Sequence, residues 1–386
     1  MIDYYETKSQ PITRKMVWEA YQEVRSKRGG SGVDGMTWNM LDKHLKGHLY
    51  KLWNRLSSGS YFPPPVLEVE IAKKVRKQVE IQLEPLFHGS SYGYRPNRSA
   101  HDAVAQSQRN CFNHDFALDL DIKSYFDTID HDLMMKALNH YCKDRWILLY
   151  VKRWLKADVL RGKERVSRIT GTPQGGVISP LLANLFLHVV FDEWMFKHHP
   201  EKPFERYADD IIVHCKTEKQ AKYMLVKIKE RMQACKLQLH PHKTKIVNMR
   251  GESDVTYARS YDFLGFTLRP VLRKIKERMI LFPGTFVSIR SKTAIRNKFK
   301  EWEIHKRRKP LEELAQDLNP MIRGLIGYFH KFWNGGMRPV WNQLNHRLLK
   351  WVKWEKGLYK YASLRWLKRK YAENPTLFAH WKLVQP

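Results

Sequence analysis

Three aspartates have the residue type and spacing that favour chemistry in this sequence. Asp121 lies in an alternating segment at 116–122, and Asp209 is followed directly by Asp210. Mg²⁺ prefers hard oxygen ligands and keeps some of its waters, so holding it beside phosphates takes only a few carboxylates. Two such ions, about 4 Å apart, can activate an attacking hydroxyl and stabilise the leaving oxygen of an in-line displacement. The three acids therefore favour phosphoryl transfer with two metal ions.

The elements around these acids are predicted to bring them together. Alternation predicts a strand over 116–122 with Asp119 and Asp121 on one face. The apolar runs 204–207 and 211–215 flank the acidic pair and predict a hairpin with two carboxylates at its tip. The alternative is a solvated pair of acids, because Asp is common in turns. The residues alone leave both interpretations open.

Helical patterns surround these strands and fill the end of the chain. A strand at 66–71 precedes the basic segment 72–77, and Arg269-Pro270 is interpreted as the linker before a helical tail. Helices are predicted at 17–25, 41–56, 131–141, 179–197, 218–235, 288–303, 321–333 and 340–355.

The composition points to a polyanionic partner. The chain has 386 residues, 69 Lys+Arg and 39 Asp+Glu, a formal net charge of +30, and 43% apolar residues that can form a core. Residues 269–386 carry a net charge of +19 and seven of the 13 Trp. Cations interleaved with aromatic rings suit phosphate neutralisation and base stacking. A helical bundle with Trp in its core and Lys/Arg on its surface is the alternative.

Several protein classes do not fit the sequence. The first ten residues show no apolar core of a secretory signal, and the stretch 181–191 is too short to span a bilayer. The four cysteines have no zinc-ligand spacing. We therefore expect a cytoplasmic protein, associated with the nucleoid or with RNA, and no membrane partner. The oligomeric state is not predicted.

Further motifs give the sequence a family resemblance. Tyr207-Ala208-Asp209-Asp210, after the segment 121–127, resembles the palm of reverse transcriptases, and the whole chain is similar to the reverse transcriptase/maturases encoded by bacterial group II introns. The matching segments, in family order, are Gly32 to Gly35, Ser91 to Pro96, Ser99-Ala100, Asp121 to Asp127, Gly171 to Gly176, Ser179-Pro180 with Asn184, Tyr207 to Asp210, Lys243 to Lys245, Phe263 to Phe266 and Asn319 to Gly324.

The resemblance implies an α+β right-hand polymerase fold followed by an all-helical domain. Fingers would occupy residues 1–100, shortened near 72–78, where the family normally carries a hairpin that supplies cations to the incoming triphosphate. The palm, with an antiparallel sheet and flanking helices, would occupy 101–268, and the helical thumb/maturase region 269–386. We expect no endonuclease domain, because no Cys-pair or His-Asn-His-like segment follows residue 378.

The resemblance also implies the active-site roles. Asp121, Asp209 and Asp210 would hold two Mg²⁺ ions, with Mn²⁺ as the alternative ion, and the Ile122 carbonyl would be a further ligand. The nucleotide-binding residues would be Phe126, which excludes a 2′-OH, together with Gln174, Gly175 and Lys243. Core packing for Phe126 and a solvated side chain for Lys243 are the alternatives.

Nucleic-acid contacts are implied at both ends of the chain. Arg95 and Arg98 would contact the template backbone, with a surface ion pair as the alternative for each. In the tail His330, Arg347, Trp333 and Trp341 would join the contact surface, although each Trp also suits a core. The remaining residues implied to bind nucleic acid are Phe263, Leu264, Gly265, Arg323, Lys331 and Arg338.

These implications lead to one main function and two alternatives. The main hypothesis is an RNA-directed DNA polymerase that extends a DNA or RNA primer with dNTPs on an RNA template, and a maturase that binds its group II intron RNA for splicing and mobility. The alternatives are a non-catalytic RNA-binding splicing cofactor, suggested by the shortened fingers, and a domesticated reverse transcriptase in defence or repair.

Overall fold

The computed structural model describes residues 6–26, 36–61, 80–161, 164–166, 168–172, 178–250, 256–275 and 277–386. The predicted strand 66–71, the shortened segment 72–78, Gly32 to Gly35, Gln174 and Gly175 lie outside these residues. The chain forms two compact units, one of residues 1–103 with 116–246 and the other of residues 104–115 with 247–386. This division by contacts falls near residue 246, and the predicted division into fingers, palm and helical thumb/maturase region stays a prediction.

The first unit is built around an antiparallel sheet with strand order β4-β5-β1-β6. Its strands are β1 (Phe116–Asp121), β4 (Phe204–Tyr207), β5 (Asp210–Cys215) and β6 (Lys245–Asn248), and a separate ribbon pairs β2 (Val159–Arg161) with β3 (Glu164–Val166). The strands predicted at 116–122, 204–207 and 211–215 are confirmed. In β1 the buried Leu118 and Leu120 alternate with the partly exposed Asp119 and Asp121, whereas residues 211–215 of β5 are all buried.

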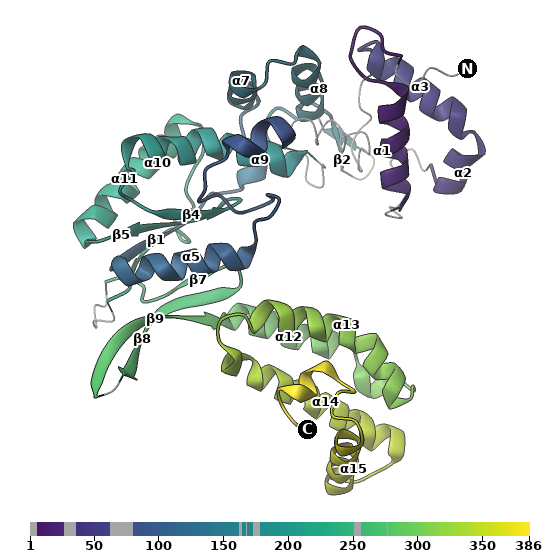
Figure 1. Cartoon of the computed structure of the whole chain (residues 1–386), viewed down its shortest axis with the longest axis vertical. Helices are drawn as coiled ribbons and strands as arrows, with labels where there is room; N and C mark the ends of the chain where they lie inside the picture. Colours follow the sequence, from purple (N-terminus) through teal and green to yellow (C-terminus); the bar gives the residue numbers. More distant parts are fainter. Residues whose placement is uncertain are drawn as a thin grey trace. The chain divides into compact units, whose positions relative to one another are not determined.

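Helices surround this sheet and supply most of the unit's core (Figure 1). The helix that begins at Ser179 contains a π turn, η2, and Phe191 of this turn packs edge-on against Phe204 of β4 with ring centroids 5.1 Å apart. The helices are α1 (Arg14–Ser26), α2 (Trp38–Lys43), α3 (Leu45–Ser57), η1 (Glu84–Leu86), α5 (Ala100–Asn113, shared with the second unit), α6 (Tyr125–Thr128), α7 (His131–Tyr141), α8 (Arg145–Leu155), α9 (Ser179–Leu187), η2 (His188–Asp192), α10 (Glu193–His198) and α11 (Glu218–Ala234).

The second unit begins with a three-stranded antiparallel sheet in the order β7-β8-β9, formed by β7 (Tyr261–Phe263), β8 (Phe266–Ile275) and β9 (Arg278–Val287). Arg269-Pro270 lies inside β8 and is not a linker, so that prediction was wrong. Pro270 is the register partner of Pro283 in β9. A non-hydrogen-bonded pair in an antiparallel ladder needs no N–H from either residue, so two opposed prolines can be accommodated there.

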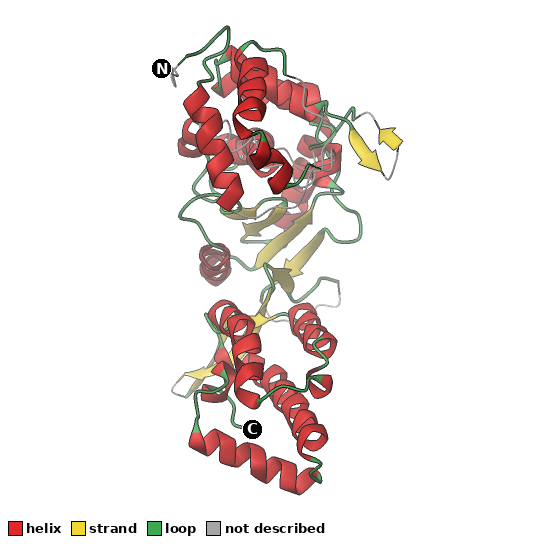
Figure 2. Cartoon of the chain, turned by 90° about the vertical axis from the view of Figure 1, so that its right-hand side faces the viewer, coloured by secondary structure: helices red, strands yellow, loops and turns green. Residues whose placement is uncertain are grey.

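The rest of the second unit is helical (Figure 2). The helix predicted at 321–333 begins earlier, at Leu311, and ends at Phe329, with Pro320 inside it as part of α13. Trp341, Trp351 and Trp381 are each at most 1% exposed, so these three rings form core, as the structural alternative for them held. The helices are α12 (Ile289–Glu301), η3 (Ile304–Lys306), α13 (Leu311–Phe329), η4 (Asn334–Met337), α14 (Arg338–Lys356), α15 (Lys360–Glu373) and η5 (Ala379–Lys382).

Candidate active site

The three aspartates meet at one end of the four-stranded sheet. Asp121 is the last residue of β1, Asp210 is the first of β5, and the two are register partners. Side chains directly opposite in an antiparallel pair lie on the same face of the sheet. Asp209 is in the adjacent turn between β4 and β5. The strand register therefore brings together carboxylates that are almost ninety residues apart in the sequence.

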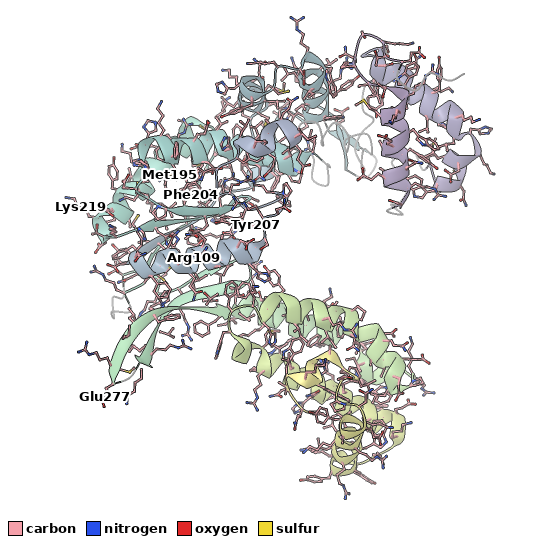
Figure 3. The ribbon with its side chains drawn as sticks, viewed as in Figure 1. Arg109, Met195, Phe204, Tyr207, Lys219 and Glu277 are labelled. Atoms are coloured by element: carbon pink, nitrogen blue, oxygen red, sulfur yellow. The ribbon has the colours of Figure 1, made fainter. Side chains whose placement is uncertain are left out.

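The turn that carries Asp209 is a two-residue hairpin loop. Tyr207 pairs with Asp210, which leaves Ala208 and Asp209 as the loop, and Tyr207 lies at the end of β4 (Figure 3). Ala208 has a φ of 56°, as the first loop residue of a type II′ turn requires. A non-glycine residue in this region is uncommon and needs support from its surroundings.

The charges around Asp209 oppose one another. Burial raises the pKa of the Asp209 carboxyl, the nearby Asp121 carboxylate raises it further, and the Lys243 ammonium acts in the opposite direction. Lys243 Nζ lies 3.4 Å from each carboxylate oxygen of Asp121. A cation thus already rests on one of the acids, and the repulsion between the carboxylates would be relieved by more positive charge.

This balance predicts how stability depends on pH. The pKa of Asp209 in the folded state is raised above its ordinary value of 3.8. As the pH rises from that value through the raised pKa, ionisation of Asp209 therefore lowers the stability of the folded state relative to the unfolded state. In EDTA at pH 7, Asp209→Asn should therefore melt a few degrees above the wild-type protein, and the difference should shrink below pH 4. Thermal melts from pH 3.5 to 7.5 measure this, and a lower melting temperature for the variant at pH 7 would contradict it.

The donor set suits a hard divalent cation. All three side chains offer carboxylate oxygens, the ligands that Mg²⁺ prefers. Within the described part of the chain, no group of three or more His, Cys, Asp or Glu side chains is assembled as a ready-made metal site. The three acids still match such an ion, because their ligand atoms are carboxylate oxygens and because they lie at the same end of the sheet. In the structure, the cation that lies at Asp121 is Lys243.

The backbone next to Asp121 also exposes a carbonyl in a suitable direction. Lys123 donates its N–H to Gln238 and His240 donates its N–H to Asp121, so the bonds to this neighbouring segment flank Ile122. In an antiparallel ladder the residue between two such bonds points its own N–H and C=O to the opposite edge. The Ile122 carbonyl therefore faces the side on which β5 and the acidic turn lie.

A glycine packs directly against the acidic turn. A Cβ built on Gly93 would lie 2.5 Å from the Ala208 nitrogen and 3.0 Å from the Tyr207 carbonyl carbon. The segment is held there because Tyr92 donates its N–H to the Arg206 carbonyl at 2.8 Å and Arg206 donates to the Ser90 carbonyl at 2.9 Å. Only glycine permits this approach of two backbones.

The segment before Gln174 is anchored beneath Phe126. Thr172 donates its N–H to the Phe126 carbonyl at 2.7 Å, and Gly171, with a φ of 80°, donates to the Ile129 carbonyl at 2.7 Å. A Cβ on Gly171 would approach the Phe126 carbonyl oxygen to 2.7 Å, so this close packing requires glycine. Phe126 is half-buried on α6, five residues after Asp121.

The structure gives the two predicted template arginines different environments. Arg95 is 7% exposed and donates to the Glu84 carboxylate at 2.7 Å and to the His88 and Ser91 carbonyls at 2.7 and 2.8 Å. These bonds occupy the guanidinium in an ion pair that lies inside the unit and not on its surface, and the template contact of Arg95 stays a prediction. Arg98 is exposed, with its guanidinium carbon 5.4 Å from the Tyr92 ring centroid.

In the second unit the predicted primer-gripping turn is a tight hairpin. Leu264 and Gly265 join β7 to β8 with φ values of 51° and 82°, the pattern of a type I′ turn. Tyr328 of α13 donates its hydroxyl to the Leu264 carbonyl at 2.8 Å, and the Gly265 carbonyl accepts from the Ser288 N–H and the Ser291 hydroxyl, each at 3.0 Å. Two helices therefore hold this turn rigidly, while Phe263 is buried beneath it.

The predicted RNA-contact residues divide between surface and core. Arg323, Lys331 and Arg338 are exposed. Trp341 is fully buried and donates its indole N–H to His330 at 3.0 Å, so the prediction that the Trp341 ring faces nucleic acid was wrong. His330 is partly exposed, and its contact with nucleic acid stays a prediction. Trp333 is 48% exposed, and Arg347 is only partly exposed.

Sequence reasoning missed a group of exposed aromatic side chains around the α14–α15 connection. Trp354, Tyr359 and Tyr361 are 77%, 90% and 78% exposed. Residues 350–370 contain eight Lys+Arg and one acid. We call these three rings, together with the eight Lys and Arg of residues 350–370, the aromatic–basic patch. The available signal was the break in apolar periodicity at Gly357, where the helix ends with a φ of 63°.

The family of the chain follows from its similarity to known sequences. Residues 64–268 match the family described as reverse transcriptase (RNA-dependent DNA polymerase), which is more than half of the chain. The chain belongs to the reverse transcriptase family. Residues 292–372 of the chain match the group II intron, maturase-specific domain. The predicted family and the α+β fold class, with an antiparallel sheet and then a helical region, are confirmed.

Individual relatives match parts of the reverse transcriptase. Group II intron-encoded protein LtrA of Lactococcus lactis subsp. cremoris is 33% identical over 190 residues, 44% of this chain and 32% of LtrA. Protein YkfC of Escherichia coli is 31% identical over 208 residues, 47% of this chain and 54% of YkfC. The chain thus spans about a third to a half of the length of these relatives.

A solved structure is also similar. The telomerase of Candida albicans, in complex with a fragment of telomeric RNA, aligns with 12% identity and a TM-score of 0.48, over 91% of this chain and 61% of that chain.

No helix in the described ranges of this chain is long and apolar enough to cross a membrane.

Proposed function

We propose that this chain is an RNA-directed DNA polymerase that extends the 3′-OH of a DNA or RNA primer on an RNA template with dNTPs. The observation that carries the proposal is the register of Asp121 opposite Asp210, with Asp209 in the adjoining turn, in a chain of this family. Three carboxylates close to bound phosphates repel the ligand unless a metal ion neutralises them. The presence of these three carboxylates together therefore favours polymerisation over RNA binding alone.

In this proposal the acids hold two Mg²⁺ ions, or Mn²⁺ in their place. Such ions supply Lewis-acid chemistry, lowering the pKa of the primer hydroxyl and balancing charge on the leaving oxygen. Asp121, Asp209 and Asp210 provide the negative charge that binds them, with the Ile122 carbonyl as a further ligand. Lys243, now at Asp121, would be free to turn toward the phosphates once metal charge lies between the acids.

The neighbouring residues would select and position the substrates. The Phe126 ring, near the ribose, would exclude a 2′-OH, while Gln174 and Gly175 would line the base pocket next to the anchored Gly171-Thr172 segment. The rigid Phe263–Leu264–Gly265 turn would hold the primer end. Positioning and electrostatics contribute most of the rate in such transfers, because the phosphoryl group needs little covalent help.

We further propose that the chain is a maturase that binds its group II intron RNA for splicing and mobility. The match of residues 292–372 to the maturase-specific domain and the basic character of residues 269–386 support this role. Arg98, Arg323, Lys331 and Arg338 would bind phosphates. These substrates imply that the protein works in the bacterial cytoplasm, associated with RNA or the nucleoid.

The aromatic–basic patch gives a direct prediction for RNA binding. Stacking of a base on an aromatic ring contributes about 1–3 kcal/mol. Combined Trp354→Ala and Tyr359→Ala substitution should therefore weaken intron-RNA binding by about tenfold or more, because both rings are exposed and leave the core intact. Filter binding across a salt series measures this. The matched control is Phe196→Ala, which removes a ring that is 66% exposed in the first unit; equal effects of both changes would contradict the prediction.

A pair of assays tests the proposed function against the non-catalytic alternative. Primer extension on an RNA template, with dNTPs and Mg²⁺, should succeed with the wild-type protein and fail with Asp121→Ala. Splicing of the intron RNA should proceed with both proteins, because binding does not use this acid. Splicing without any extension by the wild-type protein would favour the splicing-cofactor alternative.

A further inference from the structure

A fully buried ion pair lies behind the acidic turn, on the face of β4 opposite to Asp210. Arg206 and Asp192 are both 0% exposed, and the guanidinium donates to the two carboxylate oxygens at 2.8 and 2.5 Å. Burying two charges is expensive, and apolar side chains of similar volume stabilise a core about as well. The pair therefore calls for an explanation other than stability.

The π turn explains how the helix presents two acceptors to this arginine. Asn184 Oδ1 also accepts from Arg206, at 2.9 Å, although Asn184 and Asp192 are eight residues apart on the helix. In a regular α-helix of about 3.6 residues per turn, residues eight apart are about 80° out of line. A π turn adds about one residue to the helix, so the spacing becomes equivalent to seven residues, or two full turns. Both side chains then face the same arginine.

The same guanidinium holds the catalytic turn by its backbone. Arg206 Nη1 donates to the Ala208 carbonyl at 3.1 Å, and Ala208 is the residue with the left-handed φ of 56°. Asn184 in turn donates its amide to the Gly93 carbonyl at 2.5 Å. The turn is thus fixed from one side by Arg206 and from the other by the packing of Gly93.

We propose that Arg206, Asp192 and Asn184 form a positioning group that fixes the Ala208 carbonyl and thereby sets where the Asp209 carboxylate stands against Asp121. These residues touch no substrate and act through the turn. The proposal rests on the proposed polymerase function for its kinetic consequence. Its consequence for cation binding does not depend on that function, because it concerns the geometry of the acids alone.

Arg206→Lys is the most informative change. It keeps a positive charge beside Asp192 but removes the planar fork that reaches Asn184 and the Ala208 carbonyl together. We expect Mn²⁺ binding, titrated by electron paramagnetic resonance, to weaken by about 10- to 100-fold, since partners behind metal ligands have effects of that size. The primer-extension kcat should fall by a similar factor while the KM for dNTP changes less than threefold.

His214→Gln is the matched control for a merely structural role. His214 and Glu205 form another fully buried pair on β5 and β4, 2.7 Å apart, and His214 lies four residues beyond Asp210 along β5. This control should lower the melting temperature yet leave Mn²⁺ affinity and kcat within threefold of wild type. Equal loss of Mn²⁺ affinity in both variants would overturn the proposal.

The remaining outcomes distinguish a failure of the positioning role from a failure of the proposed polymerase function. If Arg206→Lys does not fold, Asn184→Ala, which removes one acceptor and keeps the ion pair, should weaken Mn²⁺ binding by at least threefold. Unchanged Mn²⁺ affinity in a folded Arg206→Lys protein would overturn the positioning role. A wild-type protein that binds Mn²⁺ through Asp209 but extends no primer would contradict the polymerase proposal alone, and the Mn²⁺ titrations would still decide this one.

Discussion

Replacing Asp209 with asparagine should reduce primer extension by at least about a thousandfold, because several kcal/mol of transition-state stabilisation depends on metal charge held at this position. Asparagine keeps the size of the side chain and the turn but removes the negative charge. Single-turnover incorporation of one dNTP on an RNA template measures the effect.

The control for this prediction is Asp132→Asn. Asp132 is an exposed acid in the first turn of α7 and belongs to the same unit. It should extend primers at the wild-type rate, and both variants should bind RNA as tightly as the wild-type protein. Substantial synthesis by Asp209→Asn would remove Asp209 from the catalytic group.

The second large effect is expected at a residue with no side chain. Gly93→Ala would place a Cβ 2.5 Å from the Ala208 nitrogen and 3.2 Å from Tyr207 Cδ1. Two of the three nearest atoms belong to backbone, so relief requires the acidic turn itself to move. A shift of about 1 Å in a reacting geometry can reduce the rate about a hundredfold. We expect a loss of at least that size in kcat, with a lower melting temperature.

Gly89→Ala is the matched control for this substitution. Gly89 is exposed in the same segment, and a Cβ built there meets nothing within 4 Å. Its activity and melting temperature should equal those of the wild-type protein. If Gly93→Ala retains kcat within threefold of Gly89→Ala, the close packing of this segment does not position the turn.

Much of the catalytic end of the sheet could be predicted from local patterns. Alternation gives the strand that ends at Asp121, and two short apolar runs give the hairpin around Asp209 and Asp210. Ser99 precedes α5 and forms a capping box with Asp102, whose carboxylate accepts from the Ser99 N–H at 3.0 Å. These features depend on neighbours within a few residues.

The parts that could not be predicted depend on distant contacts. In the sequence, Arg206 is a cation in a short strand, and only the folded chain brings it to Asp192. The π turn that aligns Asp192 with Asn184 has no signal in the spacing of apolar residues. Arg95 was assigned to the template because a cation near a polymerase motif suggests phosphate, whereas its partners are the Glu84 side chain and nearby carbonyls. The long β8–β9 hairpin was not predicted, because prolines such as Pro270 and Pro283 usually mark the end of a strand.

We expect this chain to polymerise DNA on an RNA template with the acids at the end of β1, in the turn after β4 and at the start of β5. The most direct measurement is extension of a labelled primer annealed to an RNA template, with dNTPs and Mg²⁺, by the wild-type protein beside Asp209→Asn and a sample in EDTA. The wild-type protein should extend the primer in Mg²⁺, and the other two reactions should give no extension. Failure of the wild-type protein to extend, with tight and salt-sensitive RNA binding retained, would contradict this expectation.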